Sequence, residues 1–323
     1  MDNRQNASIC CSSVSKSFGK TKVLDDINFE VKHGEIFGVI GPDGAGKTTL
    51  YRILTTLLNA DEGTAYVNGF DIVSQYKEIR RRVGYMPGRF SLYHDLTVEE
   101  NLTFFATVFN SSIEENYYLI EDIYKQIEPF KDRRAGKLSG GMKQKLALCC
   151  ALIHKPEVLF LDEPTTGVDP VSRKEFWGML MKLKSQGITI LVSTPYMDEA
   201  KLCDRIAFIL NGKVLKIDVP QKIISSYKNE IWAVKSRKMS KLLSDIRSFG
   251  KIESCYSFGD SHHVEINTDH LTDASKSEFR REMEIFLKSK GHEELTIVNI
   301  DPSIEDVFMS LSRNDYRNEN NKS

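Results

Sequence analysis

The sequence IFGVIGPDGAGKT, residues 36–48, combines an apolar run, a glycine-rich turn and the start of a helix. Residues 36–40 are almost entirely apolar, which is typical of a strand buried on both faces of a sheet. After the glycine-rich turn, apolar residues recur at helical spacing through residue 58. We therefore expect a buried strand, a loop and a helix over residues 36–58.

The loop matches the pattern G-x-x-x-x-G-K-[ST], in the strand-to-helix context that this pattern requires. Its glycines let backbone N–H groups converge on phosphate oxygens, and the helix N-terminus adds a favourable dipole. Lys47 supplies a positive charge toward the β- and γ-phosphates, and the Thr48 hydroxyl is suited to ligate Mg²⁺. The sequence thus predicts a nucleoside triphosphatase, a class that also includes GTPases, kinases and helicases.

Strand and helix signals on either side extend this unit into an α/β fold. Residues 158–161 and 188–192 read as two further buried strands, separated by an amphipathic helix around residues 173–184. Strand, helix, strand in this order predicts right-handed parallel crossovers. Asn68-Gly69 and Asn211-Gly212 each predict a type I′ hairpin turn.

The domain organisation follows from changes in the pattern of apolar and polar residues along the chain. We expect a nucleotide-binding domain over residues 8–220, with a mostly helical subdomain at about 90–153. After Pro220, short strands and helices predict a small α+β appendage over residues 221–311, and the polar residues 312–323 predict a disordered tail.

Composition excludes several classes of function. The formal net charge is −1, which leaves no basic surplus for wrapping nucleic acid. No apolar run approaches the roughly 18–20 residues that cross a bilayer, and the polar N-terminus lacks a signal-peptide core. We therefore expect a chain that stays in the cytosol. Its six cysteines lack zinc or redox spacing, so we expect reduced, packed thiols, and we expect His262-His263 at the surface rather than on zinc.

Three further motifs resemble those of ABC transporter ATPases. Residues 138–144, LSGGMKQ, resemble the family's signature motif, and residues 158–164, VLFLDEP, look like its Walker B strand with the following glutamate. Gly167-Val168-Asp169 fits the family's D-loop. The motifs follow the family's order and spacing over residues 8–220. The resemblance implies a P-loop ATPase core with a helical subdomain and a small α+β appendage.

The resemblance also implies roles for individual residues. Glu163 would be the general base and, with Lys47, the catalytic pair, while Thr48 and Asp162 would hold Mg²⁺. Phe18 would stack on adenine. In the family's geometry, the signature helix closes over ATP held by a second subunit, so dimerisation completes the active site. The residues expected to bind ATP are Phe18, Gly41, Pro42, Asp43, Gly44, Ala45, Gly46, Lys47, Thr48, Thr49, Ser139, Gly140, Gly141 and Asp169.

Two positions depart from the family pattern. Gly88 stands where a glutamine would sense Mg²⁺ and the γ-phosphate, and Pro195 stands where a histidine would hold the γ-phosphate. Proline has no side-chain donor and no backbone N–H. One hypothesis is tolerated drift in a working ATPase. The other is an asymmetric dimer, in which this chain binds ATP but hydrolyses it poorly, while its intact signature completes the site of a second ATPase.

Further local runs resemble the type-2 exporter subgroup. They are residues 89–93, 96–102 and 301–308. This resemblance implies efflux of drugs, lipids or polysaccharides, a membrane permease as partner, and a position at the cytoplasmic face of the cell membrane. Phe90, Leu92, Tyr93 and Leu96 would then either contact the permease or pack within the helical subdomain. An alternative function is a non-hydrolysing regulatory or scaffold subunit, and a soluble ribosome- or DNA-associated ABC protein is disfavoured.

Overall fold

The computed structural model describes residues 7–89, 91–266 and 273–320. The chain divides into two compact units, Met1–Pro220 and Gln221–Ser323. No helix of the described residues is both long enough and apolar enough to span a membrane.

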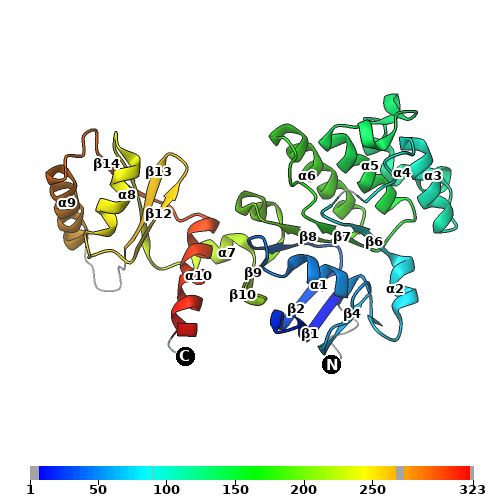
Figure 1. Ribbon diagram of the computed structural model, residues 1–323, viewed down its shortest axis with the longest axis horizontal. Helices are drawn as coiled ribbons and strands as arrows, with labels where there is room; N and C mark the ends of the chain where they lie inside the picture. The colour runs from blue at the N-terminus through cyan, green and yellow to red at the C-terminus, as the bar shows by residue number, and fades with distance from the viewer. Residues whose placement is uncertain (1–6, 90, 267–272, 321–323) are drawn as a thin grey trace. The chain divides into compact units, whose positions relative to one another are not determined.

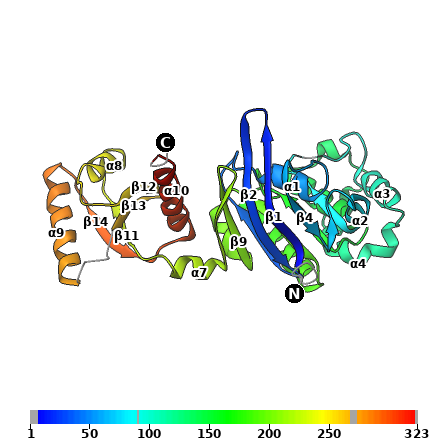
Figure 2. The same cartoon turned by 90° about the horizontal axis from the view of Figure 1, so that it is seen from below.

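Two sheets with a helix between them form the first unit. An antiparallel sheet has the order β2 (Thr21–Lys32), β1 (Ala7–Phe18), β4 (Glu62–Val67) and β5 (Phe70–Asp71). Figure 2 shows β1 and β2 as a long hairpin. The second sheet has the order β10 (Lys213–Asp218), β9 (Arg205–Leu210), β3 (Ile36–Ile40), β8 (Thr189–Thr194), β7 (Val158–Asp162) and β6 (Val83–Met86). Only β10 runs antiparallel to its neighbour there.

Helix α1 (Lys47–Leu54) packs between the two sheets, where Leu50, Tyr51, Ile53 and Leu54 join one apolar core with residues from both. This helix is shorter than the sequence predicted. It ends at Leu54 because Thr56 adopts a left-handed backbone with φ 63°. The expectation of a helix to residue 58 is thus corrected.

Other helices cover the opposite side of the parallel sheet (Figure 1). α6 (Pro170–Ser185) packs against β8, and α5 (Gly140–Leu152) packs against β6. α5 also contacts α3 (Val98–Val108) and α4 (Ile113–Tyr124). α2 (Tyr76–Arg82) precedes β6, and short 3₁₀ turns lie at Glu128–Phe130, Ala135–Lys137 and Met197–Leu202.

Both Asn-Gly hairpins form as the sequence predicted. Asn68 and Gly69 have φ 49° and 77°, and Asn211 and Gly212 have φ 48° and 75°. Two successive positive φ angles are the requirement of a type I′ turn. These turns join β4 to β5 and β9 to β10.

The second unit alternates strands and helices around one sheet of order β12-β13-β11-β14. The sheet lies between α8 and α9 on one face and α10 on the other (Figures 1 and 2). After α7 (Pro220–Ser225), the elements are β11 (Glu230–Lys235), α8 (Met239–Arg247), β12 (Ser254–Phe258), β13 (Ser261–Ile266), α9 (Asp273–Ser289), β14 (Thr296–Ile300) and α10 (Ile304–Asn320).

Two expectations about this unit are corrected. Residues 312–320 continue α10 rather than forming a disordered tail, because the helix is anchored to the sheet through Asp306 and Arg313. His262 and His263 are not at the surface, since only 4% and 5% of their areas are exposed. His263 Nδ1 lies 2.7 Å from Asp306 Oδ1, and His262 Nε2 lies 2.7 Å from the Met239 carbonyl.

The described residues contain neither a disulfide bond nor a cluster of side chains that could hold a metal ion. All six cysteines are free, and five of them are buried. No described group of three His, Cys, Asp or Glu side chains is placed to hold a metal ion.

The buried Glu265 makes the second unit sensitive to acid. Burial would raise the pKa of this carboxyl, but hydrogen bonds from Arg313, Ser254 and Asn229 lower it from 4.5 to about 2. The ionised form thus stabilises the fold above about pH 4.5, by about 3 kcal/mol, and this contribution is lost as the pH falls toward 2.

We expect Glu265→Gln to weaken the second unit at pH 7 and to flatten its stability between pH 5 and pH 2. Trp232 lies in this unit, and the only other tryptophan is Trp177. Urea unfolding followed by Trp232 fluorescence in a Trp177→Phe background measures this. An unchanged pH dependence in the Glu265→Gln variant would contradict the assignment.

Candidate functional site

The loop after β3 is shaped by glycines that no other residue replaces. Gly46 has φ 102°, and a Cβ atom there would lie 2.7 Å from the Val23 carbonyl oxygen. A Cβ atom at Gly41 would lie 2.2 Å from the Ile209 carbonyl oxygen. Both distances are shorter than real Cβ contacts, so the loop needs glycine to pass this close to β2 and β9.

Lys47, the first residue of α1, points back into this loop. Its side chain is only 3% exposed, and Nζ donates to the carbonyls of Gly41 at 2.8 Å and Pro42 at 2.9 Å. Nζ also lies 3.0 Å from Glu163 Oε1. A buried ammonium needs such partners, and the same group is a ready donor to an anion that enters the loop.

Asp162 and Glu163 follow one another at the end of β7. Asp162 is 1% exposed, and its Oδ1 accepts a hydrogen bond from Ser193 Oγ at 2.7 Å. The Glu163 backbone N–H donates to the same Ser193 Oγ at 3.0 Å. Glu163 has φ 52°, a strained value for a residue with a side chain. The Ser193 hydroxyl therefore holds the side chain of Asp162 and the backbone of Glu163.

The charge on Asp162 affects a neighbouring tyrosine. Burial, and next the negative charge of Asp162, raise the pKa of Tyr85 to about 12.

These elements enclose a cavity of about 320 Å³. It brings together many of the residues predicted from the loop motif with Glu163, which directly follows β7. The lining consists of Val23, Asp43, Gly44, Gly46, Lys47, Thr48, Thr49 and Glu163. Phe18 does not line this cavity. It lies at the end of β1, is 51% exposed, and has Lys16 Nζ 5.7 Å from its ring centre.

The signature residues and Asp169 also lie outside the cavity lining. Ser139 is the N-cap of α5, and its Oγ accepts from the Met142 N–H at 3.3 Å. Asp169 is the N-cap of α6, where hydrogen bonds led by the Ser172 N–H lower its pKa. A Cβ atom at Gly140 would lie 3.6 Å from the Gly167 carbonyl oxygen, so the starts of these two helices are close together.

Gly88 lies beside the backbone of Asp162 and the Cβ atom of Glu163, and Pro195 directly follows β8. A Cβ atom at Gly88 would lie 3.0 Å from the Asp162 carbonyl oxygen and 3.8 Å from Glu163 Cβ. Pro195 follows β8, two residues after Ser193, which pairs with Asp162. The Tyr196 ring contacts Arg173, whose Cζ lies 4.8 Å from the ring centre.

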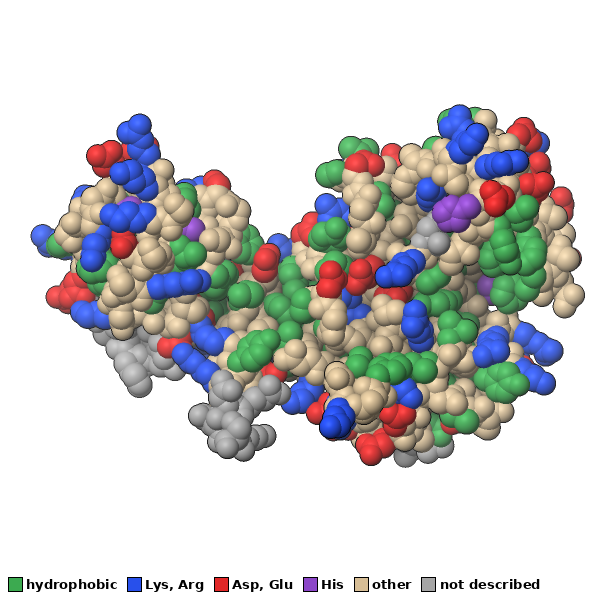
Figure 3. Space-filling view, in the orientation of Figure 1, with side chains coloured by type: hydrophobic (Ala, Val, Ile, Leu, Met, Phe, Trp, Pro, Cys, Tyr) green, Lys and Arg blue, Asp and Glu red, His purple; other side chains and the backbone are tan. Residues whose placement is uncertain are grey.

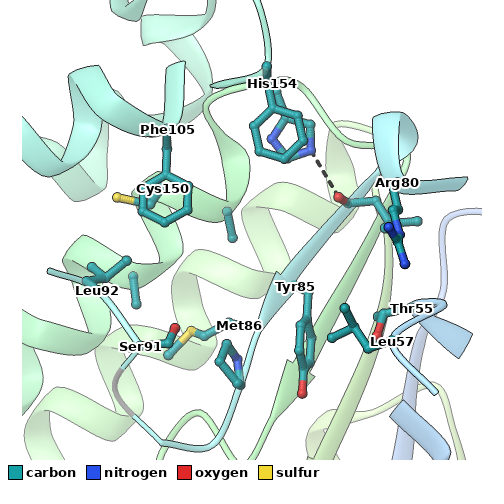
Figure 4. A pocket seen from close by; sticks show the side chains of 15 residues that line it. Thr55, Leu57, Arg80, Tyr85, Met86, Ser91, Leu92, Phe105, Cys150 and His154 are labelled. Carbon is teal, nitrogen blue, oxygen red and sulfur yellow. Dashed lines mark hydrogen bonds between the residues drawn. The ribbon is translucent and has the colours of Figure 1, made fainter. Parts of the chain in front are cut away.

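Sequence reasoning missed Ser193, whose role depends on the pairing of β7 with β8. It also missed an apolar groove of about 360 Å³ beside β6. In Figure 4, Leu92, Phe105 and Cys150 face Tyr85, Leu57 and Arg80 across it. His154 closes one end, where Nε2 donates to the Val83 carbonyl at 3.0 Å. The apolar residues after Gly88 were a signal for this groove, but its opposite wall comes from distant segments.

Comparisons with known proteins agree with this geometry. Residues 24–166 match the family described as "ABC transporter". The Nod factor export ATP-binding protein I of Burkholderia lata is 34% identical over 305 residues, covering 93% of this chain and 95% of the relative. The probable multidrug ABC transporter ATP-binding protein YbhF of Escherichia coli is 40% identical over 222 residues, 67% of this chain. That match spans only 38% of YbhF.

Solved structures resemble the first unit. An ATP-binding subunit of an ABC transporter superposes with TM-score 0.62 and 28% identity, covering 67% of this chain and 92% of the other. A dimeric bacterial ABC transporter cassette superposes with TM-score 0.58 and 28% identity, covering 65% and 98%. In this chain, that fold occurs together with the glycine-rich loop of residues 41–48 and the carboxylates of Asp162 and Glu163. This chain therefore belongs to the ATP-binding proteins of ABC transporters, a family of P-loop ATPases.

Proposed function

We propose that this chain is the ATP-binding and ATP-hydrolysing subunit of a type-2 ABC exporter, bound peripherally at the cytoplasmic face of a cell membrane. The observation that carries the ATPase role is the Lys47–Glu163 pair in the loop cavity. Export is supported by relatives named for Nod factor export, whose matches cover 93% and 96% of this chain, appendage included.

ATP would bind with its phosphates in the glycine-rich loop. Lys47 would exchange the Gly41 and Pro42 carbonyls for phosphate oxygens, which are stronger acceptors. Phe18, exposed at the end of β1, would stack on adenine. The buried carboxylate of Asp162 and the hydroxyl of Thr48 suit Mg²⁺, which would neutralise charge on the phosphates.

Glu163 would orient the attacking water and take its proton while the bond between the γ-phosphorus and ADP breaks. Ion pairing with Lys47 holds this carboxylate at the cavity before ATP arrives. The missing side chains at Gly88 and Pro195 remove two donors from the surroundings of the γ-phosphate. We propose that this site binds ATP but hydrolyses it slowly.

The signature would serve a second subunit. Ser139, Gly140 and Gly141 open α5 outside this chain's own cavity, and exposed backbone N–H groups at a helix N-terminus bind anions. Asp169 would contribute from the adjoining D-loop. We propose that a second ABC ATPase pairs with this chain and that the signature completes the hydrolysing site of that partner.

A permease would bind at the apolar groove beside β6. Of the four residues for which the sequence left permease contact and subdomain packing open, Leu92 lines the groove and Tyr93 adjoins it. Leu96 is not in the lining, and Phe90 lies outside the described residues. Met86 and Pro87 line the groove, and the next residue, Gly88, lies beside the backbone of Asp162. A partner in the groove would therefore contact the segment that leads to Asp162. This arrangement supports coupling between ATP binding and a membrane partner.

Lys47→Ala is expected to weaken ATP binding by about tenfold to 100-fold. The variant loses charged hydrogen bonds worth about 1.5–3 kcal/mol, and about 1.4 kcal/mol corresponds to tenfold in affinity. Titration with a fluorescent ATP analogue measures the effect. Lys145→Ala is the matched control, because Lys145 pairs with Glu175 away from the loop. Equal affinity in the two variants would refute the role of Lys47.

Purification of the tagged chain from gently solubilised native membranes tests the whole assignment. We expect two proteins to co-purify: a permease, and a second ATPase that has a glutamine at the position of Gly88 and a histidine at the position of Pro195. A permease without a second ATPase would indicate a homodimer and contradict the asymmetric assembly. Recovery of ribosomal or other soluble proteins without a permease would overturn the transporter function.

A further inference from the structure

Three cationic side chains line one hollow in the segment between α4 and α5. The hollow has a volume of about 490 Å³, and we call it the basic hollow. Figure 3 shows Lys and Arg side chains gathered at the upper end of the first unit, where the chain passes from α4 to α5 (Figure 1). The lining consists of Pro129, Phe130, Asp132, Arg133, Arg134 and Lys137. Phe130 is half-buried and the others are exposed, so the hollow is open to solvent.

The positive charge of the basic hollow is poorly compensated within the chain. Among the described residues, no carboxylate forms an ion pair with Arg133, Arg134 or Lys137. The nearest compensation is at Glu100, where hydrogen bonds from Thr97 and, less strongly, the charge of Arg134 lower the pKa of the carboxyl. Like charges in one hollow repel one another, and a bound anion relieves that repulsion.

The backbone of this segment is fixed by the start of α3. The Val98 N–H donates to the Arg133 carbonyl at 3.1 Å, and the Ala135 N–H donates to the Leu96 carbonyl at 2.8 Å. The Arg133 guanidinium lies on the Phe130 ring, with Cζ 4.5 Å from the ring centre. Stacking restrains a guanidinium without using its N–H donors. Arg133 is therefore preorganised to bind an anion.

The lining matches the headgroup region of an acidic phospholipid. Guanidinium groups bind phosphate oxygens through paired hydrogen bonds, and the Lys137 ammonium adds a point charge. Pro129 and Phe130 add apolar surface, which the glycerol and first acyl carbons of a lipid would cover and a free phosphate ion would not. Nucleic acid is disfavoured, because the Phe130 ring, on which a base would stack, already carries Arg133.

We propose that the basic hollow binds the headgroup phosphate of an acidic phospholipid, and so tethers the first unit to the membrane independently of the permease. The membrane location rests on the proposed function, whereas the choice of phosphate rests on the lining. The Gly136 N–H donates to the His94 carbonyl at 2.9 Å, which ties the hollow to the segment that follows Tyr93 beside the groove. The hollow therefore lies near the surface that a membrane partner would approach, where anionic lipids attract basic residues.

Flotation of the full chain with lipid vesicles, without a permease, tests the proposal. We expect binding to vesicles that contain phosphatidylglycerol and not to vesicles of phosphatidylcholine alone. Arg133→Gln with Lys137→Gln is expected to weaken that binding about 25-fold, from about fivefold for each charge removed. Lys77→Gln with Lys201→Gln is the matched control, because it removes the same charge from two exposed lysines elsewhere in the first unit.

Three results would overturn the proposal. Equal weakening by the control pair would show that net charge, not the hollow, attracts the vesicles. Equal binding to phosphatidylcholine vesicles would show that the headgroup charge is not recognised. Binding of glycerol 3-phosphate that is lost in the Arg133→Gln, Lys137→Gln variant, without vesicle binding, would assign the hollow to a free phosphate compound. Binding of a fluorescent ATP analogue by every variant reports that the ATPase domain is folded.

This test separates the inference from the proposed function. If a permease co-purifies with the chain but the vesicles do not bind, the basic hollow is refuted and the transporter assignment stands. If the vesicles bind through the hollow but no permease co-purifies, the phosphate contact stands and the transporter assignment is refuted.

Discussion

Replacing Gly140 with aspartate is expected to lower ATP hydrolysis by the assembled transporter roughly 10²–10³-fold, the cost of losing preorganised electrostatic stabilisation at a reacting phosphate. Gly140 is the first residue of α5, where the proposed partner's γ-phosphate would approach. The nearest heavy atom to a new Cβ atom is the Gly167 carbonyl oxygen at 3.6 Å, an ordinary contact. The aspartate therefore fits, and its charge repels the phosphate.

Gly178→Asp is the matched control for this prediction. It adds the same charge to α6, at a helical position where a Cβ atom meets nothing within 4 Å. Steady-state phosphate release by the purified complex measures both variants. If Gly140→Asp hydrolyses ATP at the rate of Gly178→Asp, the signature of this chain does not act on a nucleotide.

Restoring the two missing side chains is expected to raise hydrolysis at this chain's own site roughly 10²–10³-fold. The variant is Gly88→Gln with Pro195→His, assembled with a partner whose catalytic glutamate has been replaced by glutamine. This silences the partner site, so a gain belongs to this chain. Asp162, Glu163 and Lys47 are already in place, and the change supplies the two absent donors.

Any side chain at residue 88 would be crowded against the Asp162 backbone, so the control must carry the same crowding. A Cβ atom at Gly88 lies only 3.0 Å from the Asp162 carbonyl oxygen, so the backbone there must shift by a few tenths of an ångström. Gly88→Ala with Pro195→His carries the same crowding without the glutamine amide. No gain in either variant, in an assembly that still binds ATP, would count against slow hydrolysis arising from these two positions.

Local motifs were sufficient to predict the nucleotide-binding part of the fold. The loop of residues 41–48 specifies its own geometry, because its glycines permit the close passes at Ile209 and Val23. The apolar run of β7 placed Asp162 and Glu163 at a strand end. Both Asn-Gly turns were readable because their φ angles depend on only two residues.

Features that depend on contacts between residues far apart in the sequence could not be predicted from local motifs. His263 on β13 was expected at the surface, yet α10 covers it. Asp306 of α10 pairs with His263, and Arg313 of α10 pairs with Glu265 on the same strand. The same pairs hold the helix through residues that looked like a disordered tail. Ser193 reaches Asp162 only because two strands pair 31 positions apart in sequence. In each case tertiary contacts override the local pattern.

The most direct test of the central claim identifies the chain in which ATP is cleaved. The purified complex is given photoreactive ATP labelled on the α-phosphate, trapped with vanadate after one turnover, and irradiated, and the nucleotide on each chain is then identified. We predict that this chain retains ATP while its partner ATPase carries ADP. ADP on this chain in an amount equal to that on the partner would contradict the account, and ATP retained on both chains would indicate a non-hydrolysing regulatory subunit.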